Sequence, residues 1–148
     1  MYRFGPHSTS QIATIRPELQ KICRVAIQWL NISVLDGYRN ERDQNLAYSK
    51  GHSTKKWPDS LHNIYPSPAV DLALWPINWE DLERFSFFAG QIIAIARDLR
   101  IPVIWGGDWD SDTFVKEHSF IDRPHFQLIH WKENTNGNTI GNLSWKTH

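Results

Sequence analysis

The sequence predicts an α+β domain, in which a small, mostly antiparallel sheet is backed by helices. Three observations lead to this fold class. Four short apolar runs are typical of buried strands, and they cover residues 32–35, 69–74, 102–105 and 125–129. Helical spacing of apolar residues occurs in the segments that precede or separate these runs. The length of 148 residues fits one domain, so we expect a single domain over residues 1–148 with its core at about residues 17–131.

The first expected helix begins at Pro17, because proline is tolerated at the first helical position. Its apolar residues recur at helical spacing and should form one buried face. They are Ile22, Val25, Ala26, Trp29 and Leu30. The strand at residues 32–35 follows and should end at Asp36-Gly37. The next helix should cover residues 41–49 and stop at Gly51, since glycine commonly follows the last helical residue.

The longest expected helix follows the strand at residues 69–74. Asn78 should cap it, with Glu80 and Asp81 favourably placed in its first turn. Its buried stripe should consist of Leu82, Phe85, Ala89, Ile92, Ala96 and Leu99. Irregular segments are expected as a loop at residues 51–68, a turn at 106–109 and a flexible tail at 134–141. A loop as long as residues 51–68 within a compact domain is usually functional.

The composition argues against several classes of function. Sixteen basic and sixteen acidic residues give a formal net charge of zero, which disfavours binding to duplex nucleic acid or anionic membranes. No apolar stretch approaches the ~20 residues that span a bilayer. Residues 1–14 lack the apolar segment of a secretory signal, so we expect synthesis as a cytosolic protein.

Cysteine and tryptophan usage gives two further expectations. The single cysteine, Cys23, allows no intrachain disulfide and lies among apolar residues, so it should be a small core residue. Eight tryptophans are unusual for this length. Trp75, Trp79, Trp105 and Trp109 fall in loop-like surroundings, where aromatic side chains often line binding clefts. Trp105 and Trp109 could equally be anchors of the core.

Three segments beside expected strands contain possible metal ligands. They contribute His62, Asp71 and His125. Two imidazoles and one carboxylate are a common ligand set for catalytic zinc, with a fourth position open for water. Such a site would also explain an aspartate within the apolar strand at residues 69–74, where an unpaired carboxylate is costly to bury. Spacing alone leaves alternatives open: His62 could be a loop histidine, and Asp71 could pair with an arginine.

Five segments in this order resemble the zinc D-alanyl-D-alanine carboxypeptidase and phage L-alanyl-D-glutamate endopeptidase family. They are Asp36-Gly37-Tyr38-Arg39 followed by Gln44, Ser60-Leu61-His62, Ala69-Val70-Asp71-Leu72, Trp105-Gly106-Gly107-Asp108-Trp109, and Asp122-Arg123-Pro124-His125-Phe126-Gln127. The resemblance covers roughly residues 32–129, and the last two segments are similar to the phage endolysin branch. It implies a fold of the hedgehog and D-Ala-D-Ala-peptidase type.

The resemblance also implies roles for individual residues. His62, Asp71 and His125 would bind Zn²⁺, and Asp122 would be the general base. Arg39 would bind substrate and stabilise the oxyanion. Substrate contacts are further expected from Ser60, Gln44, Trp105 and Trp109. One feature departs from the family: eight residues separate His62 from Asp71, and Pro66, Ser67 and Pro68 fill part of a gap that is tighter in many members.

The expected function is therefore that of a zinc-dependent peptidoglycan peptidase, of the endolysin type that cuts the L-alanyl-D-glutamate bond of the peptide stem. A D-alanyl-D-alanine carboxypeptidase is the alternative within the same chemistry. A non-catalytic zinc module that binds the cell wall, and a metal-free structural protein, are alternatives from other classes. An endolysin would be made in the host cytoplasm and would reach the wall through a membrane opened by a holin. We expect a monomer.

Overall fold

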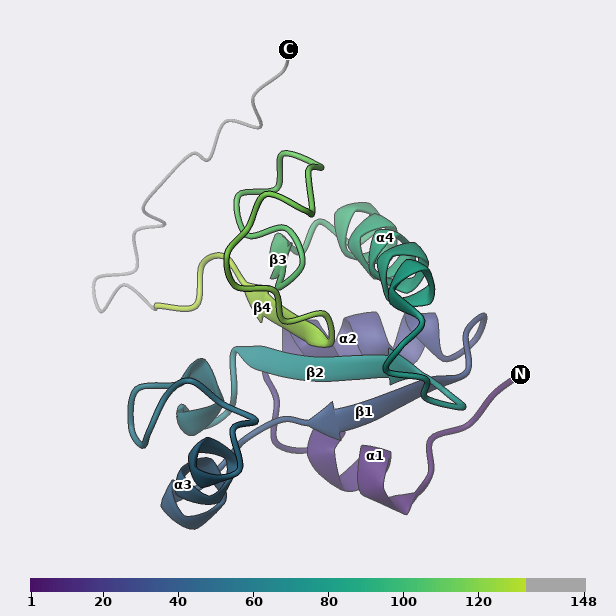
Figure 1. Ribbon diagram of the computed structural model, residues 1–148. Coiled ribbons are helices and arrows are strands. Elements are labelled where there is room, and N and C mark those ends of the chain that lie inside the picture. The colour runs from purple at the N-terminus through teal and green to yellow at the C-terminus, as the bar shows by residue number, and fades with distance from the viewer. Residues whose placement is uncertain (133–148) are drawn as a thin grey trace.

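The computed structural model describes residues 1–132 of the chain, and the expected flexible tail at residues 134–141 lies outside this part. The described residues form a four-stranded antiparallel sheet of order β1-β2-β4-β3, together with four α-helices and one 3-10 turn (Figure 1). Along the chain these elements are α1 (Pro6–Ile12), α2 (Pro17–Ala26), β1 (Ile32–Asp36), α3 (Glu41–Ser49), the 3-10 turn Leu61–Asn63, β2 (Ala69–Leu74), α4 (Leu82–Asp98), β3 (Val103–Trp105) and β4 (His125–Leu128). This architecture confirms the predicted α+β class.

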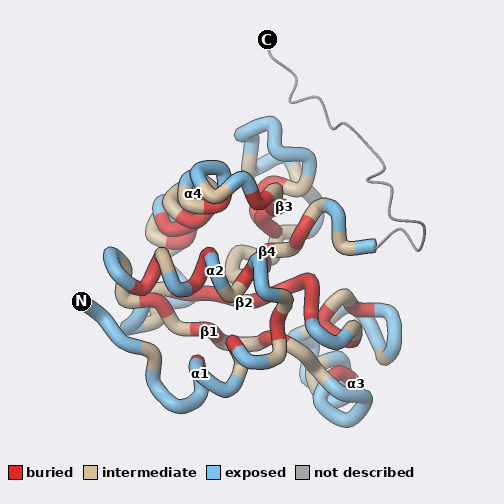
Figure 2. The backbone as a smooth tube through the Cα atoms, turned by 180° about the vertical axis from the view of Figure 1, so that it is seen from behind, coloured by how far each residue is buried: buried red, intermediate tan, exposed pale blue. Residues whose placement is uncertain are grey.

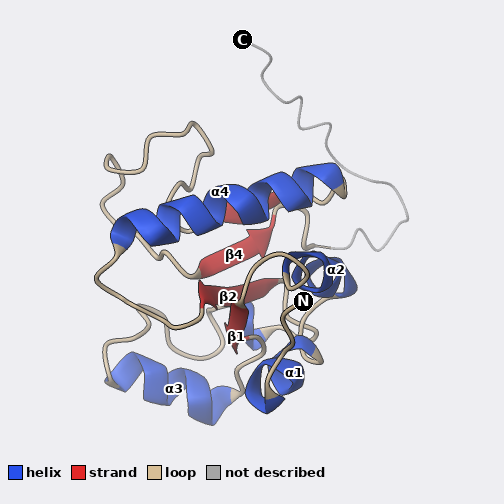
Figure 3. Cartoon of the chain, turned by 90° about the vertical axis from the view of Figure 1, so that its right-hand side faces the viewer, coloured by secondary structure: helices blue, strands red, loops and turns tan. Residues whose placement is uncertain are grey.

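Helices cover the sheet and complete the core. α4 lies across the sheet and contacts β2 and β3, while α2 packs beside α4 (Figure 3). Figure 2 shows buried residues concentrated on the strands and on the side of α4 that faces them. Cys23 is fully buried in α2, as expected for a small core residue. No helix within residues 1–132 is long and apolar enough to cross a membrane.

Helix α1 has no counterpart among the elements that the sequence predicts. It packs on β1, and Ile12 and Ile15 at its end join the hydrophobic core. The core therefore extends further toward the N-terminus than residue 17. Proline at the first helical position begins both α1 and α2, as expected for Pro17.

Three helical expectations were wrong at element ends. Asp81, rather than Asn78, caps α4: its carboxylate accepts a hydrogen bond from the backbone N–H of Arg84. Asn78 instead accepts from the N–H of Glu80 in a turn that precedes the helix. Leu82 is 43% exposed because it is the first helical residue. Trp29 is 74% exposed because α2 ends at Ala26, so helical spacing no longer applies beyond it.

The register of the central strands gathers polar residues at one end of the sheet. Asp71 of β2 lies opposite His125 of β4 on one side and opposite Asp36 of β1 on the other. The pairing of β1 with β2 shifts between Val34 and Asp36, so Leu35 is an extra residue. A bulge of this kind changes which side chain faces a neighbouring strand, and bulges are frequent beside active sites. Here it places an aspartate, rather than Leu35, opposite Asp71.

Candidate metal centre

His62, Asp71 and His125 lie together as the sequence predicts, each from a different element. His62 comes from the 3-10 turn, Asp71 from β2 and His125 from the start of β4. His62 Nε2, Asp71 Oδ1 and His125 Nδ1 form a triangle in which all three pairs of atoms are 3.3 Å apart. All three side chains are buried or nearly so, with 4%, 13% and 9% of their surface exposed. The three-residue group is one that could hold a metal ion.

The triangle fits the dimensions of a zinc site. In a tetrahedral site with metal–ligand distances of about 2.0–2.1 Å, two ligand atoms lie about 3.3–3.4 Å apart. Asp71 Oδ1 supports the same reading, because it is buried without a hydrogen-bond partner among the described residues. A buried carboxylate oxygen without a partner is costly unless something else satisfies it. A divalent cation held by the three atoms would do so.

Each ligand is oriented by a partner on its other polar atom. His62 Nδ1 donates to the carbonyl of Gly37 at 2.6 Å, and His125 Nε2 donates to Gln127 Oε1 at 2.8 Å. Because both partners are acceptors, the protons of the neutral imidazoles belong on these outer nitrogens, and the inner nitrogens keep a free electron pair. Asp71 Oδ2 accepts from Arg39 Nη2 at 3.2 Å. The free electron pairs of the three inner atoms, His62 Nε2, Asp71 Oδ1 and His125 Nδ1, therefore point toward a common centre.

The pKa values at the centre reflect the attraction between the carboxylate and the imidazoles. Burial alone would raise the pKa of Asp71, but His62 and His125 stabilise its charged form and hold that pKa well below the usual range. For His125, burial alone would lower the pKa, but the adjacent carboxylate of Asp71 raises it. Asp71 is thus ionised at neutral pH, as a metal ligand must be.

Helix α1 and the residues that follow it fix the turn that orients His62. The N–H of Gly37 donates to Gln11 Oε1, and the N–H of Tyr38 donates to Thr14 Oγ1. The backbone of Gly37 approaches this helix so closely that an added Cβ would lie 2.8 Å from the Gln11 carbonyl oxygen. Only glycine fits there without displacement. The carbonyl that orients His62 is therefore held by an element that the sequence did not predict.

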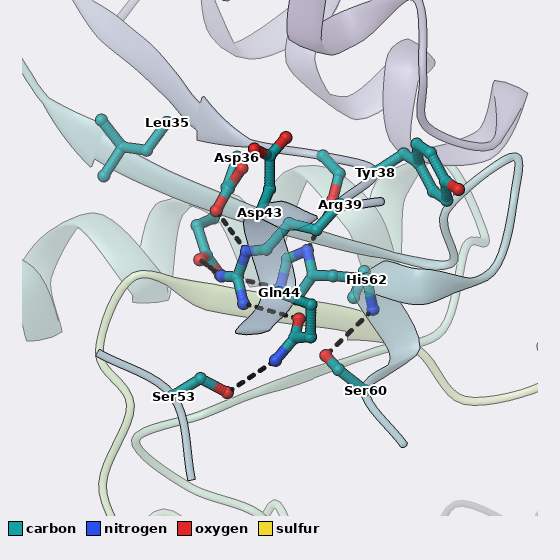
Figure 4. Close-up of polar contacts among 12 residues, drawn as sticks. Leu35, Asp36, Tyr38, Arg39, Asp43, Gln44, Ser53, Ser60 and His62 are labelled. Atoms are coloured by element: carbon teal, nitrogen blue, oxygen red, sulfur yellow. Dashed lines mark hydrogen bonds and ion pairs between the residues drawn. The ribbon is translucent and has the colours of Figure 1, made fainter. Parts of the chain in front are cut away.

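Ser60 and Gln44 lie around the centre without touching the ligand atoms. Ser60 caps the 3-10 turn, since its hydroxyl accepts from the N–H of His62 at 3.2 Å. Gln44 is fully buried, and its carbonyl accepts from Arg39 Nη1 (Figure 4). The same carbonyl accepts from Asn63 Nδ2. Its amide donates to Ser53 Oγ at 3.0 Å and to the Lys55 carbonyl at 2.6 Å. These contacts hold the loop after α3 against Arg39.

Asp122 lies beside the centre, on the segment that leads into β4. Its Oδ2 is 4.0 Å from His125 Nδ1, and its side chain is 36% exposed. Burial raises the pKa of Asp122, the charge of Asp71 adds to this, and nearby His125, His62 and Arg39 offset it in part. A raised pKa suits a carboxyl group that takes up and returns a proton near neutral pH.

The Gly-Gly-Asp-Trp turn fixes the backbone around Asp122. The N–H of Asp122 donates to the Gly106 carbonyl at 2.8 Å, and the N–H of Gly106 donates to the His125 carbonyl at 2.8 Å. An added Cβ at Gly106 would overlap the Asp122 carbonyl. Glycine is therefore required for this close approach, which sets the position of Asp122 relative to His125.

The two tryptophans of this region differ in their surroundings. Trp105 is only 4% exposed and belongs to the core, and its indole N–H donates to the Arg123 carbonyl. Of its two alternative roles, the structure shows the core anchor. Trp109 packs against the ring of His125, with centroids 5.5 Å apart, and stacks on Phe120. Trp109 is thus placed beside the centre. Trp75 and Trp79, expected beside a cleft, are each 58% exposed.

Sequence reasoning assigned no role to Gly37, Gln127 or Asp36, which the structure places around the ligands. Gln127 had a usable signal, because residues two apart on a strand share a face and Gln127 follows His125 at that spacing. Gly37 acts through its backbone carbonyl, which leaves no signature in a side chain. Asp36 depends on the bulge in β1, and a sequence pattern does not reveal which residue a bulge inserts.

Comparisons with known proteins agree with this site. The family described as phage L-alanyl-D-glutamate peptidase matches residues 1–129 of the chain. The L-alanyl-D-glutamate peptidase of Escherichia phage T5 is 30% identical over 137 residues, which are 86% of this chain and 98% of that protein. The crystal structure of the L-Ala D-Glu endopeptidase ChiX of Serratia marcescens matches with a TM-score of 0.64 and 26% identity. That match covers 85% of this chain and 90% of the ChiX chain.

Proposed function

Because the chain belongs to the phage L-alanyl-D-glutamate peptidase family, we propose that it is a zinc-dependent endopeptidase that hydrolyses the L-alanyl-D-glutamate bond of peptidoglycan peptide stems. The relatives' names support the bond and the reaction. The observation that carries the metal dependence is the triangle of His62 Nε2, Asp71 Oδ1 and His125 Nδ1, with sides of 3.3 Å. Its donor set and dimensions are those of catalytic zinc sites.

The zinc ion would supply Lewis-acid chemistry: it lowers the pKa of a bound water to about 7 and polarises the carbonyl of the scissile bond. His62, Asp71 and His125 would hold it. Their outer partners Gly37, Arg39 and Gln127 fix the orientation of the three side chains, as such partners do in other metal sites.

Asp122 would be the general base. Its carboxylate lies 4.0 Å from His125 without being one of the three candidate ligands, and it remains partly open to solvent, where a substrate can reach it. Its carboxylate would take the proton from the attacking water and later deliver it to the leaving amine. One group can do both because the two transfers follow one another at nearly the same place.

Arg39 and Trp109 are the further candidates for substrate contact. Arg39 directs three of its nitrogens to Asp36, Gln44 and Asp71, and a guanidinium carries more N–H donors than these three contacts use. The remaining donors could stabilise negative charge on the carbonyl oxygen. Trp109 would form an apolar wall next to His125. Ser60 and Gln44 would act on substrate only through the backbone and side chains that they hold.

The test is digestion of purified peptidoglycan by the zinc-loaded protein, with released fragments and new amino termini identified by mass spectrometry. New D-glutamate amino termini that disappear on chelation would support the proposal. In Asp122→Ala, bound zinc should be retained while turnover falls about 10²–10⁴-fold, the usual contribution of general acid–base catalysis. Asp122 contacts Gly106 through its backbone, so the substitution leaves that turn intact.

Other results would change the assignment. Free D-alanine as the product would identify a D-alanyl-D-alanine carboxypeptidase. One bound zinc per chain without cleavage of any wall type would identify a non-catalytic zinc module. Wild-type turnover in zinc-loaded Asp122→Ala would remove Asp122 from the role of base. Access to the wall through a holin, synthesis in the host cytoplasm and the monomeric state stay predictions.

A further inference from the structure

Two carboxylates face each other across β1 and β2 at the edge of the metal centre. Asp36 lies opposite Asp71 because of the bulge between Val34 and Asp36. Like charges directly opposite on neighbouring strands destabilise a sheet. A leucine would stand at this position if the strands paired without the bulge. The bulge therefore brings a second negative charge to a ligand that is already buried, and this arrangement needs a compensating cation.

Arg39 is that cation, and it joins the two carboxylates. Its Nε donates to Asp36 Oδ2 (Figure 4). Its Nη2 donates to Asp71 Oδ2 at 3.2 Å. Only 11% of the Arg39 side chain is exposed, so water screens these contacts weakly. Asp36 is the more open partner, with 35% of its side chain exposed.

The backbone of Arg39 is fixed as firmly as its side chain. Its N–H donates to the His62 carbonyl at 2.7 Å, and its carbonyl accepts from Asn63 Nδ2 at 3.2 Å. The guanidinium thus starts from a fixed point beside one ligand, His62, and reaches another, Asp71. Its direction between these points is set by Asp36 on Nε and by Gln44 on Nη1.

This arrangement decides which oxygen of Asp71 faces the other ligands. Oδ2 is engaged by Arg39, whereas Oδ1 is directed to His62 and His125 and has no hydrogen-bond partner among residues 1–132. Without a fixed guanidinium on Oδ2, the carboxylate could rotate and offer either oxygen to the centre. Orienting Arg39 is therefore equivalent to orienting the ligand.

We propose that Asp36 is a positioning residue of the metal centre, which acts through Arg39 to present Asp71 to the metal through Oδ1 alone. The inference rests on the zinc function proposed above and adds a residue to which that function assigned no part. Charge works in the same direction as orientation. Removing Asp36 leaves the positive charge of Arg39 opposed by Asp71 only, which makes the centre less attractive to a divalent cation.

The test is the zinc affinity of purified full-length variants, measured by competition with a chromophoric chelator. In Asp36→Ala the affinity should fall about 10–100-fold, the usual effect of losing a partner that orients a ligand. Asp36→Asn keeps an acceptor for Arg39 Nε but loses the charge, so its affinity should lie between those of Asp36→Ala and the wild type. The matched control is Asp59→Asn, which removes an exposed carboxylate that makes no side-chain hydrogen bond or ion pair in the described chain, and which should leave zinc affinity unchanged.

A double-mutant cycle tests whether Asp36 works through Arg39. In the Arg39→Met background, Asp36→Ala should lower zinc affinity by clearly less than it does in the wild type, because the intermediary is gone and only the charge of Asp36 is left to lose. An equal loss in both backgrounds would overturn the proposal, since Asp36 would then act by its charge alone. Unchanged zinc affinity in Asp36→Ala would overturn it too, even if turnover fell. If the wild type bound no zinc, the proposed function would fail instead, so the two failures are distinguishable.

Discussion

Of the three groups of possible metal-ligand side chains in the described residues, the two that contain histidine differ in what holds them. His62, Asp71 and His125 project from strands and a 3-10 turn, and each has a partner on its outer polar atom. Asp108, Asp110 and His118 lie on the loop between β3 and β4. There His118 Nε2 is 3.6 Å from a carboxylate oxygen of each aspartate, and the side chain of Asp110 is 57% exposed.

The partners of the second group serve the loop itself. Both carboxylate oxygens of Asp108 accept backbone N–H groups, from Asp112 and from Thr113. Such bonds shape a turn and leave fewer electron pairs for a ligand. In the group of His62, Asp71 and His125 (the strand centre), by contrast, each polar atom that faces outward has a hydrogen-bond partner, and the electron pairs that face inward are free. Both groups bring ligand-type side chains close together, but of the two only His62, Asp71 and His125 have partners that direct their free electron pairs to one point.

The largest effect is expected when one histidine is removed from each group. His125→Ala should abolish stoichiometric zinc binding and peptidoglycan hydrolysis, because the centre loses one of three ligands. The loss of affinity should exceed the about 100-fold that a missing outer partner can cost. His118→Ala is the matched variant and should bind one zinc per chain. Metal analysis after gel filtration, together with fragment release, provides the measurement.

Loss of zinc from His118→Ala with retention in His125→Ala would reverse the assignment of the two groups. Loss from both variants would mean that the loop supports the strand centre. Circular dichroism of each variant checks that the fold is retained, because His125 is itself buried.

Much of the fold could be predicted from the sequence because its strands are short apolar runs with clear ends. Residues 69–74 and helix 41–49 match β2 and α3 at both ends. The predictions failed where tertiary contacts decide. Helix α1 is short and polar, and it is stabilised by packing on β1 rather than by its own pattern. The start of α4 offered several capping residues close together, and only geometry selects Asp81 over Asn78.

The candidate site was predictable to a different extent. The candidate ligands His62, Asp71 and His125 came from a resemblance in the order of motifs, since their spacing alone is uninformative. Residues that act through the backbone, such as Gly37, have no side-chain signal. The role of Asp36 depends on a register shift in β1. A sequence therefore indicates which residues take part in the chemistry more readily than what holds them in place.

A smaller effect is expected when the change affects a residue that holds a candidate ligand in place, rather than a ligand itself. In Gly37→Ala the new methyl group would press on Gln11 and Thr14 and displace the carbonyl that orients His62. Overpacking of this kind costs about 1–3 kcal/mol of unfolding free energy. Zinc affinity should fall about 10-fold, the lower end of the range for a disturbed outer partner. Denaturant unfolding and chelator competition measure the two effects.

The control for this change is Gly90→Ala. Gly90 lies in α4, and an added Cβ there would meet nothing within 4 Å. Alanine should therefore stabilise the helix by about 0.5–1 kcal/mol and leave zinc affinity unchanged. If Gly37→Ala behaved like Gly90→Ala, the close approach of the turn to α1 would not matter for the centre.

The smallest effect should come from Asp110→Asn, which makes the same chemical change in the loop group that Asp36→Asn makes beside the strand centre. Asp110 is mostly exposed, and its ion pair with His118 is of a kind that contributes little to stability. Water and salt screen an exposed charge, so the strand centre should sense its loss weakly. We expect zinc affinity within about twofold of the wild type and unfolding free energy within about 0.5 kcal/mol. Measuring both aspartate variants under the same chelator competition makes the contrast direct. An equal loss of zinc affinity in Asp36→Asn and Asp110→Asn would show that the loop helps to hold the strand centre. The two groups would then be coupled through the segment between β3 and β4.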